Sequence, residues 1–69
     1  MNADAKLTAK IAALSVEQLK EISLRLTLAS TAEEILVCNR AERELERRVS
    51  AAEFIAHMND CAALLEIAA

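Results

Sequence analysis

The sequence contains no glycine and no proline, and its only aromatic residue is Phe54. Glycine and proline form the tight turns of hairpins, and β-branched and aromatic residues fill strands, so all-β and α/β folds lack their usual residues. The chain is instead 55% apolar, mostly alanine and leucine, and 28% charged. Because these residue types favour helix, the composition predicts an all-α protein.

Long apolar runs and an excess of basic charge are also absent. No stretch reaches the roughly 18 to 20 apolar residues that cross a bilayer, and residues 1–15 do not resemble a secretory signal. We therefore expect a cytoplasmic protein without membrane contact, in which Cys38 and Cys61 are reduced thiols. The net charge of −3 disfavours nucleic acid as a partner.

A chain of 69 residues has room for one domain, which we expect to span residues 1–69. A domain of this size buries a modest share of its unfolded surface, and its apolar burial barely offsets the chain entropy. Small proteins without disulfides or metals often gain stability by pairing. We therefore expect oligomerisation, at least to a dimer, to complete the fold.

Helix starts are marked by a Ser or Thr followed three residues later by Glu or Gln. Ser15, Thr31 and Ser50 each begin such a pattern, and an apolar-periodic run follows each of them. Asp4 can cap an earlier helix. The sequence thus predicts a small bundle of helices near residues 4–14, 16–29, 32–48 and 51–67.

The boundary at Ser50 leaves two alternatives, because the chain could continue as one helix over 32–67. At about 100° per residue, the apolar residues on the two sides of Ser50 form stripes on roughly opposite faces. A break lets both stripes reach one core, and this is the arrangement we favour; a continuous helix would bury them against different neighbours, as in a swapped dimer. The stripes are Ile35, Cys38, Ala41, Leu45, Val49 and Ala52, and then Phe54, Ile55, Met58, Cys61, Ala62 and Leu65.

Some apolar residues fall outside a single core face. In the second helix, Leu24 and Leu28 lie opposite the face that carries Leu19. Contiguous apolar patches of this kind mark interfaces more often than scattered leucines do. The alternative is that a fourth helix covers them within one monomer. We predict a self-association or partner surface that comprises Leu24, Leu28, Leu36, Val37, Phe54 and Met58.

Residues 40–48 form the only dense charge cluster, in which arginines alternate with glutamates. Arg40, Arg43 and Arg47 share one side of the predicted helix. The simplest interpretation is a solvated face with weak i,i+4 ion pairs. The alternative is a ridge that binds an anionic partner, although the neighbouring glutamates would repel phosphate.

No arrangement typical of catalysis is present, and a chain this short has little room to enclose a substrate. His57 and Cys61 have a spacing that could share a metal, with Asp60 and Cys38 as further ligands, but the clustered Cys and His pairs of structural zinc sites are missing. Buried cysteines usually pack as small apolar groups. We predict no enzyme activity, no metal, no cofactor and no small-molecule substrate.

Two functional classes follow from these patterns. The first is a small accessory or regulatory protein that recognises itself or another protein through amphipathic helices. The second is a nucleic-acid-binding regulator of helix-turn-helix or helical-hairpin type, which would use Arg40, Arg43 and Arg47. Its recognition helix would begin with residues 32–36, which are acidic and apolar where phosphates would approach. The sequence therefore favours the protein-interaction module.

Overall fold

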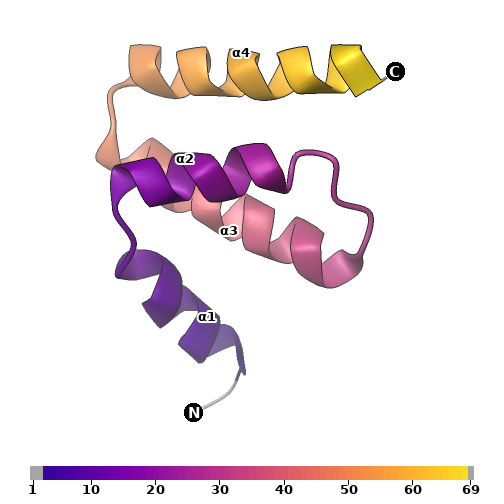
Figure 1. The fold of residues 1–69 in the computed structure, drawn as a ribbon. Helices are drawn as coiled ribbons and strands as arrows, with labels where there is room; N and C mark the ends of the chain where they lie inside the picture. The colour runs from indigo at the N-terminus through magenta and orange to yellow at the C-terminus, as the bar shows by residue number, and fades with distance from the viewer. Residues whose placement is uncertain (1–2, 69) are drawn as a thin grey trace.

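The computed structural model describes residues 3–68, and within that range the chain forms four helices and no strand. The helices are α1 (Ala3–Ala12), α2 (Val16–Arg25), α3 (Ala32–Arg48) and α4 (Ala51–Ala68). The predicted all-α fold is confirmed. The break near Ser50 is confirmed as well, because α3 ends before Val49 and α4 starts after Ser50 (Figure 1).

The three predicted start signals act as helix caps. Ser15 forms a complete capping box, in which its hydroxyl accepts from the Gln18 N–H at 3.1 Å and the Gln18 side chain accepts from the Ser15 N–H at 2.8 Å. Thr31 and Ser50 likewise accept from the N–H three residues ahead. Each cap satisfies a backbone donor that has no partner within its own helix. These caps replace the missing glycine and proline as boundary signals.

The four helices form a flattened arrangement. The α2 helix packs along α3, α4 runs beside α2, and α1 diverges at the opposite end of the molecule (Figure 1). The Cα trace measures 39 × 29 × 14 Å. Because the Cα atoms of one helix span about 4.6 Å and packed helices lie about 8–10 Å apart, the shortest dimension is about two helices deep. Several helices therefore have one covered face and one open face.

The apolar core lies where α1, α2 and α3 meet. Ile11, Leu19, Ala41 and Leu45 form its centre, and Leu19, Ala41 and Leu45 are fully buried. Half-buried apolar side chains surround this centre: Leu7, Leu14, Val16, Ile22, Val49 and Phe54. Phe54 is the contribution of α4 to this core.

Arg48 of α3 forms hydrogen bonds to the C-terminal end of α1. Its guanidinium donates to the main-chain carbonyls of Ala12, at 2.7 Å, and Leu14. The last carbonyls of a helix lack partners within the helix, and a glycine-containing turn often satisfies them. Here the Arg48 side chain of α3 has that role, and Glu44 Oε2 accepts from Arg48 Nε at 2.6 Å.

The structure corrects several details of the sequence prediction. The α2 helix ends at Arg25, earlier than the predicted residue 29, and α1 ends at Ala12, earlier than residue 14. Both predicted stripes also extend beyond the area that neighbouring helices cover. Ile35, Ile55 and Leu65 were predicted to face the core, but their exposed fractions are 45%, 59% and 50%.

Candidate interaction surface

An apolar groove lies between the end of α2, the start of α3 and α4. Its volume is about 300 Å³. Ile35 from α3 and Leu65 from α4 line it together, although both were expected in the core. The remaining apolar lining comes from Leu26, Ala29, Met58 and Ala62. The groove therefore exposes a contiguous apolar surface that single scattered leucines would not form.

The structure places the six predicted interface residues in three different environments. Leu28 and Leu36 are exposed, by 57% and 44%, and each is adjacent in sequence to a residue that lines the groove. Met58 lines the groove itself. Leu24 and Val37 are half-buried, and Phe54 packs against the core. Met58 thus lines the groove, Leu28 and Leu36 are exposed next in sequence to lining residues, and Phe54 belongs mainly to the interior.

A buried polar cluster lies between α2, α3 and α4. The Ser23 hydroxyl is fully buried and donates to Glu42 Oε2 at 2.7 Å. The Cys38 thiol lies 3.5 Å from the same oxygen, and Cys61 Sγ lies 3.6 Å from Ser23 Oγ. Because unpaired buried polar groups are costly, these contacts explain how a serine can occupy the interior of α2.

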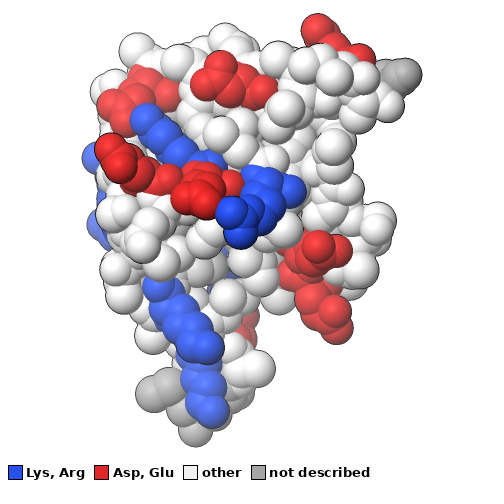
Figure 2. All heavy atoms as spheres, viewed as in Figure 1, with Lys and Arg blue, Asp and Glu red and all other residues white. Residues whose placement is uncertain are grey.

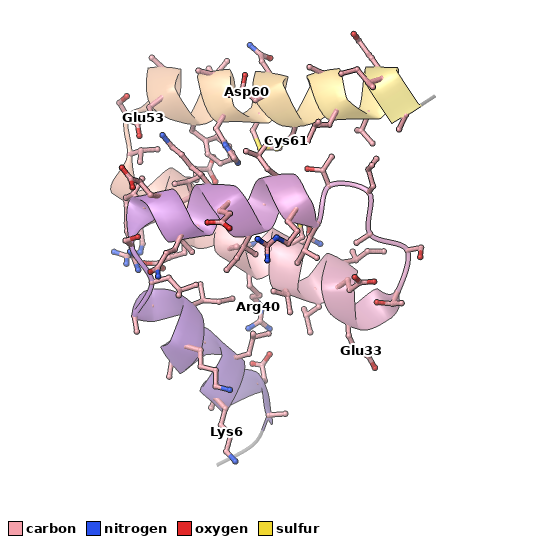
Figure 3. All side chains as sticks on the ribbon, viewed as in Figure 1. Lys6, Glu33, Arg40, Glu53, Asp60 and Cys61 are labelled. Carbon is pink, nitrogen blue, oxygen red and sulfur yellow. The ribbon has the colours of Figure 1, made fainter. Side chains whose placement is uncertain are left out.

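His57 and Cys61 extend this cluster on α4. Both are buried, and Cys61 Sγ lies 3.7 Å from His57 Nε2. Figure 3 shows Cys61 directed from α4 toward α2. Within residues 3–68, no three His, Cys, Asp or Glu side chains are arranged to hold a metal ion. The cluster joins α4 to α2 and α3 through hydrogen-bonding groups.

The two cysteines are free and buried. Burial, reinforced by the nearby Glu42 carboxylate, raises the pKa of the Cys38 thiol to about 11. A thiol with a raised pKa is rarely present as the nucleophilic thiolate at neutral pH. Cys38 therefore acts as a structural group that donates to Glu42.

Arg40, Arg43 and Arg47 do share one hollow, of about 220 Å³, between α1 and α3. However, Arg40 pairs with Asp4 and donates to Thr8 at 3.0 Å, so it bridges the two helices (Figure 3). Arg47 pairs with Glu44. Of the three arginines, only Arg43 forms no ion pair or hydrogen bond through its side chain among the described residues. The predicted ridge is thus largely neutralised within the chain.

Glu44 is the carboxylate that organises this part of α3. It accepts from both Arg47 and Arg48. The hydrogen bonds from Arg47 and then Arg48 hold the pKa of the Glu44 carboxyl below its usual value. One of the i,i+4 ion pairs expected on this helix is present, between Glu44 and Arg48, whereas Arg40 pairs with Asp4 of α1.

Charge is unevenly distributed over the molecule. The α4 helix carries Glu53, Asp60 and Glu66 and no Lys or Arg. Figure 2 shows acidic side chains over α4 and a band of basic side chains over α1, at the opposite end of this face. No helix within residues 3–68 is long and apolar enough to span a membrane.

Sequence reasoning missed Ser23 and Glu42 as members of a buried polar cluster. Ser23 lies on the α2 face that also carries Leu19 and Ile22, and a polar residue on a core face was the available signal. Pairing it with Glu42 requires knowledge of how α2 and α3 pack. No family model, curated protein or solved structure matches this chain.

Proposed function

We propose that this protein is a non-enzymatic interaction module that associates with further copies of itself through its apolar groove. The observation that carries the proposal is that the exposed Ile35 and Leu65 line one groove. Leu28 and Leu36, which are next in sequence to lining residues, are exposed as well. Monomeric soluble proteins seldom leave several large apolar side chains exposed together. Association with a second copy would remove this surface from water.

The energetics favour this function for a chain of this size. Apolar surface removed from water contributes roughly 25 cal/mol per Å², so covering a few exposed leucine and isoleucine side chains contributes several kcal/mol before the cost of association. Residues 3–68 contain no further helix or strand besides α1–α4 that could cover the groove. A second copy supplies that cover.

The test is the effect of groove substitutions on the oligomeric state. Sedimentation velocity over a series of protein concentrations should show self-association of the wild type, and Leu65→Asp should shift the protein toward the monomer. Ile55→Asp is the matched control, because Ile55 is similarly exposed on α4 but does not line the groove. A wild type that remains monomeric throughout the series would contradict the proposal.

A further inference from the structure

Glu42, Arg43 and Glu46 of α3 form no ion pair among residues 3–68. Glu42 accepts hydrogen bonds only from the neutral Ser23 and Cys38 side chains, and no Lys or Arg of residues 3–68 forms an ion pair with it. Glu46 lies one turn later and is also without an ion pair in this range. Like charges at i,i+4 repel each other by a few tenths of a kcal/mol. A cation placed between them would relieve this repulsion.

Arg43 supplies a cation on the same face of α3, but it forms no ion pair with either carboxylate. Arg43 is exposed and has no ion pair in the part of the chain described, although its i,i+3 spacing from Glu46 would allow one. The other arginines are all engaged: Arg25 with Glu21, Arg40 with Asp4, and Arg47 and Arg48 with Glu44. Arg43 is the exception among them.

These three charges line one hollow, of about 280 Å³, together with Asn39 and Phe54. The hollow adjoins the apolar groove, since Asn39 and Glu42 line both. The exposed Ile35 and Leu36 lie one to two turns earlier on the same helix. We name this surface the α3 patch; it comprises Ile35, Leu36, Asn39, Glu42, Arg43 and Glu46.

The composition of the α3 patch makes it complementary to itself. In a twofold dimer the same surface meets its own copy, so it must carry both members of every contact. When two α3 helices pack antiparallel, the guanidinium of one copy can approach the two carboxylates of the other, and the reverse contact forms at the same time. Apolar residues then supply affinity, while complementary charges fix the orientation.

We infer that a second copy of this chain docks on the α3 patch, with each Arg43 placed between Glu42 and Glu46 of the opposite copy. This inference rests on the proposed self-association and assigns its orientation. Lys6 and Lys10 do not offer the same combination, because α1 carries none of the large apolar side chains that are exposed on the described chain. The pairing therefore depends on Arg43.

The experiment is a charge exchange between two variants. Arg43→Glu should weaken self-association at least tenfold in sedimentation equilibrium, because three carboxylates then face three others. Lys10→Glu is the matched control: it changes the net charge equally at an exposed residue far along α1, and it should associate as the wild type does. Circular dichroism establishes that both variants retain their helices.

The decisive arm mixes Arg43→Glu with Glu46→Arg. Neither side chain contributes to the core. In the mixed dimer three of the four charge contacts are attractive, whereas all four are repulsive in the Arg43→Glu dimer. We expect mixed dimers that associate at least tenfold more tightly than Arg43→Glu does alone, detected by mass spectrometry of one isotope-labelled variant. If the mixture fails to associate, or if Arg43→Glu behaves as Lys10→Glu does, the assigned orientation is wrong and self-association itself stands. If the wild type does not associate, the proposed function fails and the pairing fails with it.

Discussion

The two sides of the α2–α3 pair differ in how completely their apolar side chains are buried. On the α1 side, Leu19 and Leu45 are fully buried and Arg48 closes the end of α1. On the α4 side, Phe54 packs against the core, and the Lys20–Glu53 ion pair and a polar cluster add further contact. Ile35 and Leu65 nevertheless remain exposed across a groove. We call the α1 side, whose apolar side chains are buried, the closed side, and the α4 side, whose groove is exposed, the open side. The difference places most of the buried apolar core in α1–α3, and we propose that recognition takes place between α3 and α4.

The sharpest way to break this comparison is to truncate one leucine on each side. Leu45→Ala creates a cavity in the closed side and should lower the free energy of unfolding by about 3 kcal/mol. Leu65→Ala removes the same atoms from a half-exposed site and should cost the monomer less than about 1 kcal/mol. Urea unfolding at low protein concentration measures both. Equal losses would contradict the division into a closed and an open side.

The attachment of the C-terminal end of α1 should depend in part on the Arg48 guanidinium. Arg48→Met retains much of the aliphatic chain but removes the donors to Ala12 and Leu14, so we expect a loss of about 2 kcal/mol. Hydrogen exchange should show faster opening of α1 than of α2. Arg25→Met, which removes an exposed i,i+4 pair, is the control and should have little effect. Uniform acceleration over all four helices would show that α1 is not held separately.

The polar cluster should stabilise the packing of α4 on α2 and α3. Ser23→Ala leaves Glu42 without its shortest hydrogen bond and should destabilise the protein by about 1 to 2 kcal/mol. The amides of α4 should then exchange faster than those of α1, because the cluster joins α4 to the rest of the fold. Ser30→Ala, at an exposed residue of the α2–α3 connection, is the matched control. Unchanged exchange in α4 would disprove a role for Ser23 in its attachment.

The smallest expected effect is a pH dependence that arises on the closed side. Because Arg47 and Arg48 lower the pKa of Glu44 in the folded protein, its ionised form stabilises the fold above the usual carboxyl pKa of 4.5. That contribution is lost as the pH falls from 4.5 through the lowered pKa. The difference in unfolding free energy between wild type and Glu44→Gln should therefore be larger at pH 6 than at pH 3. A difference independent of pH would exclude this linkage.

The fold class and the helix boundaries at caps follow from local chemistry, and this is why they could be predicted. Ser15, Thr31 and Ser50 act within four residues, so their effects need no knowledge of packing. The phase change at Ser50 located the break between α3 and α4 for the same reason. Helix ends without such signals, as at Arg25, were predicted less accurately.

The candidate surface could be predicted only in part. Periodicity identifies a stripe, but it cannot say how much of that stripe a neighbour covers, so Ile35 and Leu65 were assigned to the core. The exposure of Leu28 and Leu36 could be predicted because they fall outside the main stripes. The pairing of Ser23 with Glu42 and the isolation of Arg43 depend on contacts between helices that are distant in sequence.

A dilution series followed by methyl NMR tests the central claim most directly. If copies associate on the open side, the Ile35, Leu36 and Leu65 methyl signals should shift with protein concentration, whereas those of Leu19 and Leu45 should not. The diffusion coefficient should fall over the same concentration range. Methyl signals that are all independent of concentration, with diffusion that remains that of a 7.5 kDa monomer, would contradict the account.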